Sequence, residues 1–476
     1  MLDERSLGSL IRNKGREGRR GFTLPRLDVE KTDIEKVLPK KSLRKEKPGL
    51  PEVDEPTAIR HYTNLSRKNW GIDTNFYPLG SCTMKHNPRA NEAAAAVPGF
   101  SNLHPLQPEK GSQGALRVMH ELQGFLSEIS GLPAVSLQPM AGAQGELTSI
   151  LMVKRYFEDV GDDERTTVLV PATAHGTNPA TASMADFESV EVGLDEHGCV
   201  DVDELREKVD ETTAALMITN PNTCGVYERN IAEIAEILHE KGAFLYMDGA
   251  NMNANLGRMR PADAAVDIMH FNLHKTFSTP HGGGGPGCGA IACSGTLAPF
   301  RPDPTVEKDG DTYRFICPEK SIGRMSTFHG NFGVILKAWN YIKMHGPELR
   351  DVTDMAVLNA NYVRARLRGA YRVPYDELCK HEVVVQPPKG MKALDIAKGL
   401  IDHGYHPPTI YFPLVVKEAM LIEPTETESK ETLDDFIGAM LELAETEIEE
   451  LEEAPTQAPT RRLDETRAAR NLKARW

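Results

Sequence analysis

Short apolar runs alternate with helical patterns between about residues 110 and 300. Apolar runs predict strands at 167–170, 190–192, 214–218, 244–247 and 268–271, and helical spacing predicts helices at 179–187, 202–209 and 231–239. Alternation of this kind predicts a mostly parallel sheet with helices on both faces. In such sheets, ligands bind beyond the carboxyl ends of the strands.

A second pattern follows residue 300. Helical spacing at 333–344 and 354–371 precedes predicted strands at 381–385 and 419–422 and predicted helices at 393–402 and 432–452. Two strands and two helices predict a small α+β domain. We therefore expect an extended arm at 1–65, a large domain at 66–330, connecting helices at 331–375, a small C-terminal domain at 376–453 and a tail at 454–476.

The first 65 residues are polar and broken by prolines, with a basic run at 40–47. Such a segment is either a solvated arm or an arm that packs on a partner subunit, and the sequence leaves both readings open.

Composition narrows the class of protein. The 476 residues are 40% hydrophobic and 26% charged, which is typical of a globular chain. The net charge of −14 argues against nucleic acid or an anionic membrane as a general partner, and no run approaches the ~18 apolar residues of a membrane span. Seven scattered cysteines without a CxxC pair, and no secretory signal at the N-terminus, predict a cytoplasmic protein.

Four polar loops directly follow predicted strands, at 174–179, 220–223, 248–251 and 274–276. Taken alone, Asp248 could cap a helix and Lys275 could be a solvated loop residue. Together, a strand-end aspartate and a strand-end lysine one β-unit later are what pyridoxal 5'-phosphate (PLP) requires. The lysine joins the cofactor's aldehyde, and the carboxylate keeps the pyridine nitrogen protonated.

Two further features fit the same cofactor. The small-residue turn at 141–146 leads into a helical run at 147–157, and a helix N-terminus can bind a phosphate, although most such turns only permit a tight backbone. His175 could stack on the cofactor ring or cap the next helix. The glycine-rich loop at 281–287 is not a P-loop, because no GK[ST] follows it.

Several motifs carry a family resemblance. These are YPLGSCTMK at 77–85, HGTNPA at 175–180, DGAN at 248–251, NLHKTFSTPHGGGGPG at 272–287 and RRLDE at 461–465. The chain resembles the glycine cleavage system P-proteins (glycine decarboxylases) from about residue 60 onward. It is most similar to the lysine-bearing half found where the enzyme is split into two chains.

This resemblance implies the fold-type-I architecture of PLP-dependent transferases. It also implies PLP-dependent decarboxylation of glycine, with release of CO2 and transfer of the aminomethyl group to the lipoyl arm of the H-protein. The expected partners are that carrier and a sister chain (subunit 1), in a heterotetramer with two copies of each. By resemblance, Lys275 is the Schiff-base lysine, Asp248 the pyridinium partner and His175 the ring-stacking residue.

The predicted site is broader than these three catalytic residues. The predicted cofactor-binding residues are Gly142, Ala143, Gln144, His175, Thr177, Asn220, Thr223, Asp248, Ala250, His274 and Lys275. Tyr77, Ser81, Cys82 and His281 are predicted to line a substrate channel, although the 77–85 loop could equally be a structural turn. Arg324, His281 and His329 are candidates for binding glycine's carboxylate by neighbourhood alone. No metal site is expected, because the sequence has no HExxH motif.

Two other functions remain open from the sequence. Another fold-type-I enzyme, such as an aminotransferase or an amino-acid decarboxylase, would share the Asp248 and Lys275 pair. Dependence on glycine and a lipoyl carrier would separate the first reading from transfer to a 2-oxo acid. A non-catalytic regulatory subunit is the second alternative, and retention of both residues argues against it.

Overall fold

The computed structural model describes residues 10–281, 287–458 and 460–472. Its contacts divide the chain into two compact units. One unit combines the described residues up to Thr74 with those from Pro455 onward, and the other spans Asn75–Ala454. The larger unit contains every predicted site residue.

A seven-stranded sheet forms the centre of the larger unit, in the order β1-β7-β6-β5-β4-β2-β3. Five neighbouring strands run parallel: β2 (Thr167–Pro171), β3 (Glu188–Val192), β4 (Thr213–Thr219), β5 (Phe244–Gly249) and β6 (Ile268–Asn272). At one edge, β7 (Gly289–Cys293) and β1 (Ala134–Ser136) are added antiparallel. The predicted mostly parallel sheet is confirmed, and the two antiparallel additions were not predicted.

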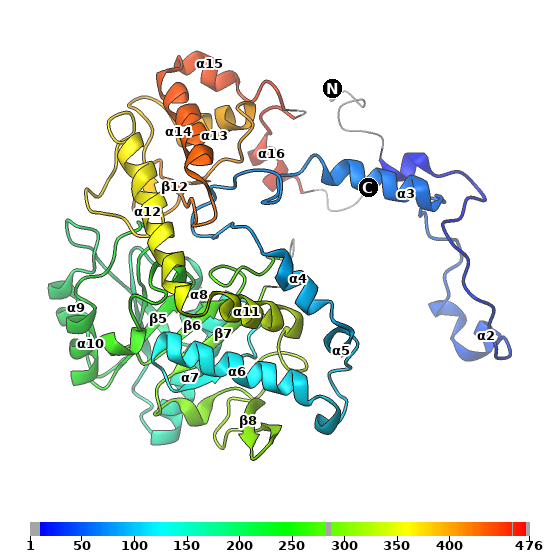
Figure 1. Cartoon of the computed structure of the whole chain (residues 1–476), viewed down its shortest axis with the longest axis horizontal. Coiled ribbons are helices and arrows are strands. Elements are labelled where there is room, and N and C mark those ends of the chain that lie inside the picture. Colours follow the sequence, from blue (N-terminus) through cyan, green and yellow to red (C-terminus); the bar gives the residue numbers. More distant parts are fainter. Residues whose placement is uncertain (1–9, 282–286, 459, 473–476) are drawn as a thin grey trace. The chain divides into compact units, whose positions relative to one another are not determined.

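Helices cover both faces of this sheet (Figure 1). Along β5, Leu245 and Met247 belong to one buried apolar cluster, whereas Phe244 and Tyr246 belong to another, because successive strand residues face opposite sides. The first cluster includes residues of α6 (Gln113–Ser130), α10 (Ile231–Glu240) and α11 (Phe332–His345). The second includes residues of α7 (Gly142–Val160) and α8 (Thr177–Met184). The helix α9 (Val202–Lys208) and the hairpin of β8 (Thr305–Asp309) and β9 (Thr312–Ile316) complete this part.

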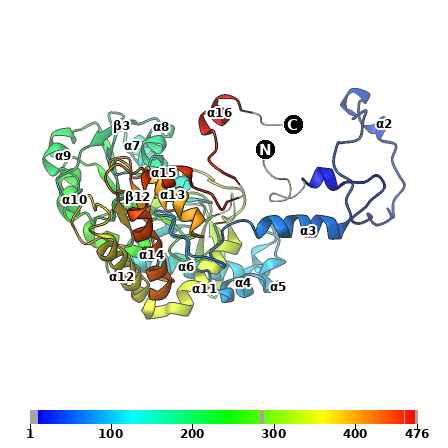
Figure 2. The ribbon, with the colours of Figure 1, turned by 90° about the horizontal axis from the view of Figure 1, so that it is seen from above.

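A three-stranded antiparallel sheet lies in the C-terminal part of the same unit. It has the order β10-β12-β11, with bounds Val383–Val385, Met420–Ile422 and Thr409–Ile410. The helices α12 (Leu349–Leu367), α13 (Ala393–Asp402), α14 (Lys430–Glu445) and α15 (Ile448–Glu453) accompany it. In Figure 2, α13, α14 and α15 lie together, as their contacts require.

One helix prediction was wrong. The single helix expected at 432–452 is two helices, α14 and α15, because Thr446 is extended at φ −72° and ψ 140° and ends the first of them. The helix predicted at 393–402 coincides with α13.

The smaller unit contains α3 (Glu55–Ser66), the short helix α2 (Ile34–Val37) and, near the C-terminus, α16 (Glu465–Arg470). Within it, Asp54 caps α3 by accepting a hydrogen bond from the N–H of Thr57. Several large apolar side chains are exposed, including Phe22, Leu24, Leu27 and Val29. Among the described residues, no helix of either unit is both long and apolar enough to cross a bilayer.

Candidate functional site

The carboxyl ends of β2, β4, β5 and β6 meet the start of α7 around a cavity of about 210 Å³. Most of the predicted cofactor-binding residues line it. They are Gly142, Ala143, His175, Thr177, Thr223, Asp248, Ala250, His274 and Lys275. Ser81, Glu146, Thr219, Asn251 and Asn272 complete the described lining. The sequence-predicted loops are thus brought together in space.

Gln144 and Asn220 were also predicted to bind the cofactor, but they are not among the described lining residues. The side chain of Gln144 accepts a hydrogen bond from the N–H of Met140 at 2.7 Å and donates one to the carbonyl of Met325 at 2.6 Å. The Oδ1 of Asn220 accepts the N–H of Glu228 at 3.0 Å. Both side chains therefore hold backbone close to the cavity.

Asp248 lies near the end of β5 with only 3% of its surface exposed. Its Oδ1 accepts the N–H of Ala250 at 2.9 Å and lies 3.5 Å from Nε2 of His270. Burial opposes the charged carboxylate, but His270, the Ala250 N–H and Lys275 outweigh it and hold the pKa of Asp248 below its ordinary value. The cavity therefore contains a carboxylate that is ionised at neutral pH.

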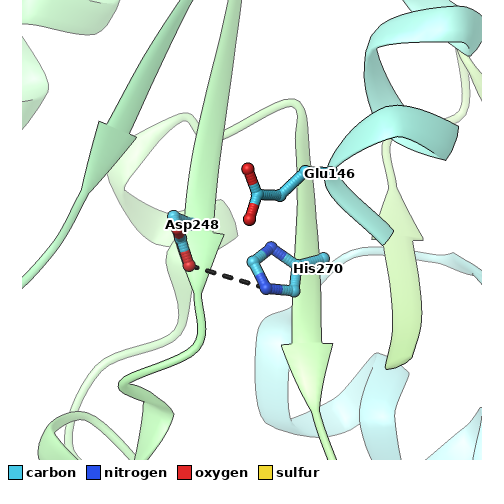
Figure 3. Close-up of side chains that lie close together, drawn as sticks. All are labelled: Glu146, Asp248 and His270. Atoms are coloured by element: carbon cyan, nitrogen blue, oxygen red, sulfur yellow. Dashed lines mark ion pairs between the residues drawn. The ribbon is translucent and has the colours of Figure 1, made fainter. Parts of the chain in front are cut away.

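Glu146 is a buried member of the site that the sequence did not predict. It lies in the second turn of α7, beside Asp248 and His270 (Figure 3). Its carboxylate accepts hydrogen bonds from Oγ1 of Thr177 at 2.8 Å and Nδ2 of Asn178 at 2.7 Å. Burial and the charge of Asp248 raise the pKa of Glu146 to about 7. Glu146 is thus largely neutral below that pH.

His270 on β6 is the second unpredicted residue. Its Nδ1 lies 2.6 Å from the hydroxyl of Tyr246 and its ring is fully buried. Burial lowers the pKa of His270 even though Asp248 opposes this, so the ring is neutral. When the Tyr246 hydroxyl donates to Nδ1, Nε2 carries the proton and faces Asp248 (Figure 3). A histidine inside an apolar strand was the only signal in the sequence.

Lys275 and His175 face the cavity from the two strand ends at which they were predicted. The Nζ of Lys275 donates a hydrogen bond to the carbonyl of Ser81 at 2.8 Å. The Nδ1 of His175 lies 2.9 Å from Oγ1 of Thr177, and burial lowers the pKa of His175. A neutral imidazole is therefore available beside the cavity.

The four predicted channel residues differ in whether they line the cavity. Ser81 lines the cavity, whereas Tyr77, Cys82 and His281 are not among the described lining residues. The Tyr77 ring stacks on His406 with centroids 4.1 Å apart. His281 lies edge-on to His274, a lining residue, with centroids 5.3 Å apart. Burial raises the pKa of the Cys82 thiol to about 11, so it remains protonated.

Two of the three candidates for binding glycine's carboxylate, Arg324 and His329, lie away from this cavity. Arg324 pairs with Asp303 at 3.8 Å. His329 lines a separate cavity of about 240 Å³ together with apolar residues such as Phe100 and Phe332. Neither residue is part of the described lining of the Lys275 cavity.

The cavity has the groups that PLP requires. The first N–H groups of α7, at Gly142 and Ala143, have no partner within the helix and can bind a phosphate. Thr219 Oγ1, Asn251 Oδ1 and Asn272 Oδ1 are buried in the lining without a hydrogen-bond partner among the described residues. Buried polar atoms normally have partners, so these three indicate a polar ligand. With Asp248 and Lys275 beside them, they fit the cofactor that this fold implies.

Two sequence families match the chain. The family described as "Glycine dehydrogenase, C-terminal domain" matches residues 352–466, and "Aminotransferase class-V" matches residues 144–298. The second match contains Asp248 and Lys275.

Solved structures share the fold. A glycine decarboxylase (P-protein) of the glycine cleavage system, in inhibitor-bound form, has a TM-score of 0.75 at 22% identity, covering 86% of this chain and 94% of that one. A NifS-like protein has a TM-score of 0.61 at 16% identity, covering 78% of this chain and 99% of that one. These similarities confirm the predicted fold-type-I architecture.

Relatives with higher identity span nearly the whole chain. A probable glycine dehydrogenase (decarboxylating) subunit 2 of Halalkalibacterium halodurans is 55% identical, covering 97% of this chain and 96% of the relative. Its counterpart from Alkaliphilus oremlandii is 49% identical, covering 98% of each. The chain therefore belongs to the family of glycine dehydrogenase (decarboxylating) subunit 2 proteins.

Proposed function

We propose that this chain is the lysine-bearing subunit of a PLP-dependent glycine decarboxylase. It releases CO2 from glycine and passes the aminomethyl group to the lipoyl arm of the H-protein. The observation that carries the proposal is one cavity lined by Lys275, Asp248 and the N-terminus of α7, in a chain 55% identical to a glycine dehydrogenase subunit.

Each cofactor contact has a candidate residue. The N–H groups of Gly142 and Ala143 would bind the phosphate, and Asp248 would bind the ring nitrogen. His175 would cover a face of the ring, and Lys275 would join the aldehyde. When bound, PLP supplies an electron sink for the carbanion left as CO2 departs.

The residues of the chain set the conditions for that chemistry. Asp248, ionised and held by the Ala250 N–H, would keep a proton on the ring nitrogen of the bound cofactor. Nε2 of His270, on the adjoining strand, lies 3.5 Å from the Asp248 carboxylate and favours its ionised form.

The partners follow from the family. Its name, subunit 2, implies a partner subunit. We further propose that this partner is the sister chain, subunit 1, that the assembly contains two copies of each, and that the lipoylated H-protein is the acceptor. A cytoplasmic location is part of the same proposal, supported by seven cysteines that are all free thiols.

The visible spectrum of the purified chain tests this function. After loading with PLP, the chain should show the absorption of lysine-bound cofactor, and glycine should alter it. The titration is repeated with subunit 1 present. A chain that takes up no PLP under either condition would contradict the proposal. Transfer of the amino group to a 2-oxo acid would support an aminotransferase instead.

A further inference from the structure

Two buried glutamates lie at the ends of neighbouring strands. Glu382 directly precedes β10, and Glu423 directly follows β12. The antiparallel register pairs Val383 with Ile422, which brings the two glutamates opposite each other. Both are fully buried, and their carboxylate oxygens and a ring nitrogen of His381 lie within 4.8 Å of one another. Neither glutamate belongs to the described lining of the Lys275 cavity.

The glutamates hold the loop that contacts Lys275. The N–H of Ser81 donates to Glu382 at 2.7 Å, and the N–H of Thr83 donates to Glu423 at 2.8 Å. Ser81 and Thr83 have φ angles of 61° and 48°, which residues with a side chain seldom adopt. Hydrogen bonds to buried carboxylates stabilise this backbone. Strain of this kind, fixed by specific partners, is characteristic of functional loops.

The loop is also packed tightly on β12. A Cβ at Gly80 would lie 2.5 Å from the carbonyl oxygen of Leu421, so no larger residue fits there without movement. The N–H of Gly80 donates to that same carbonyl at 3.1 Å. The position of the Ser81 carbonyl, which accepts Nζ of Lys275 at 2.8 Å, is therefore set by the small sheet.

The two glutamates differ in their hydrogen bonds. Glu423 accepts three hydrogen bonds, from the N–H and Oγ1 of Thr83 and from Nδ2 of Asn253. Glu382 accepts the Ser81 N–H alone, and its Oε1 lies 3.6 Å from Nε2 of His381 without a hydrogen-bond partner among the described residues. Burial and the charge of Glu423 raise the pKa of Glu382 far above its ordinary value. Burial raises the pKa of Glu423 as well, but the hydrogen bonds from Thr83 and Asn253 oppose that rise, so Glu423 is the member of the pair that more readily holds a negative charge.

That negative charge acts on Lys275. Lys275 is an electrostatic partner of both glutamates and opposes the rise in the pKa of each. The other titratable groups coupled to the pair or to Lys275 are Cys82, Glu146, His175, Cys224, Asp248, His270, His274, His281, Cys379 and His381. Burial keeps the thiols and imidazoles neutral, so the carboxylate of Asp248 is the other negative charge that acts on Lys275.

We propose that Glu382 and Glu423 are positioning residues. They hold the Ser81 carbonyl where it binds the amine of Lys275 once glycine has displaced that amine from the cofactor. The inference rests on the proposed function. In the exchange, the double bond between the protonated Nζ and the cofactor's aldehyde carbon would be replaced by a double bond from glycine's nitrogen to that carbon. The two protons that glycine's ammonium gives up would be gained by Nζ. The resulting ammonium donates to the Ser81 carbonyl beside the charge of Glu423.

The test uses Glu423→Gln in the full chain, with its partner subunit if PLP loading requires it. Glycine affinity is read from the visible spectrum, and PLP affinity is measured separately. We expect glycine affinity to fall at least ~10-fold, as loss of a charged hydrogen-bond partner typically causes, with PLP affinity within ~2-fold of wild type. Equal loss of both affinities, or no loss of glycine affinity, would overturn the proposal.

A double-mutant cycle separates an effect on the displaced Lys275 amine from a general structural effect of the substitution. In a Lys275→Ala background there is no amine to seat, so Glu423→Gln should no longer weaken glycine binding. A penalty of equal size in both backgrounds would show a merely structural role. Failure of wild-type chain to respond to glycine would instead sink the proposed function, so the two failures are distinguishable.

Two more variants guard against misfolding and non-specific effects. Thr83→Val removes one hydrogen bond to Glu423 and should weaken glycine binding about 3-fold without loss of PLP; an unchanged affinity would count against the proposal. Glu228→Gln is the matched control, because Glu228 is equally buried and binds the N–H of Val200, with no electrostatic coupling to Lys275. Its glycine affinity should match wild type.

Discussion

Asp248 and Glu146 are both buried, and a carboxylate oxygen of each lies within 4.8 Å of the other and of a ring nitrogen of His270. Their protonation nevertheless differs. Asp248 accepts a main-chain N–H and faces His270, and its pKa is lowered. Glu146 accepts only neutral side-chain donors and meets the charge of Asp248, which contributes to raising its pKa to about 7. One charged and one neutral acid is the arrangement that burial favours.

Lys275→Ala should abolish glycine decarboxylation. The ε-amine is the one nucleophile in the described lining that can join an aldehyde, and it already faces the cavity. Release of labelled CO2 from glycine measures the loss, with a melting curve to establish folding. Full activity in a folded variant would remove Lys275 from its assigned role.

Asp248→Asn should retain PLP but slow turnover at least ~100-fold, because a pre-placed charge in a buried site typically contributes that much or more. Asp263→Asn, which alters an exposed ion pair with Arg260, serves as the control. The assignment fails if turnover by the Asp248 variant equals that of the control.

Glu146 should make stability depend on pH. Its folded pKa of about 7 lies above the ordinary 4.5, so the stabilisation is complete below pH 4.5 and is lost as the pH rises through 7. We expect Glu146→Gln to raise the melting temperature of the PLP-free chain relative to wild type at pH 8 but not at pH 4.5. The gain in unfolding free energy should reach at most about 3 kcal/mol. Equal differences at both pH values would contradict this.

At the scale of the elements, the strand-helix alternation could be predicted because each strand is an apolar run and each helix repeats its apolar residues at helical spacing. The strands β2 to β6 and their loops follow from it. The antiparallel β1 and β7 have only three and five residues, of mostly small side chains, and give no such signal. The break at Thr446 was hidden by charged helix-forming residues on both sides, which are compatible with one long helix.

The candidate site was predictable only in part, for a related reason. Residues at strand ends, such as Asp248 and Lys275, can be placed by topology alone. Glu146 lies inside a helix and His270 inside a strand, and they meet beside Asp248 because α7 packs against β6. Glu382 and Glu423 come from a separate sheet more than a hundred residues downstream of Lys275. Such meetings depend on packing that no local pattern encodes.

The start of α7 provides a prediction about an element. A Cβ at Gly142 would lie 2.3 Å from Oδ1 of Asn272, a buried lining residue. Gly142→Ala should therefore displace Asn272 and weaken PLP binding about 10-fold, measured by equilibrium titration of the PLP-free chain. The same change at Gly124, inside α6 with open space around its Cβ, should leave PLP affinity unaltered. Equal affinities in both variants would contradict a phosphate site at this turn.

At the scale of the whole molecule, co-expression with subunit 1 should give an assembly of two copies of each chain. Light scattering on the purified complex measures its mass. The family name supports a partner, and the exposed apolar side chains between Phe22 and Leu50 offer a surface for one. A chain that purifies separately from subunit 1 would refute the assembly.

The five-part division by residue number stays a prediction. Contacts separate the chain at Thr74 and Ala454, which places the N- and C-terminal segments in one unit and all site residues in the other. Each unit has its own capped helices, and the larger one contains the four buried apolar clusters.

The pairing of Val383 with Ile422 has a consequence for how this protein tolerates insertions and deletions. Adding or removing one residue in β12 would turn Glu423 to the opposite face of its strand, since side chains alternate with a period of two. The chain could then retain its fold and its cofactor lysine while losing the carboxylate that serves it. A length change that an exposed loop would tolerate would therefore weaken glycine binding from a strand that contributes no residue to the described lining of the Lys275 cavity.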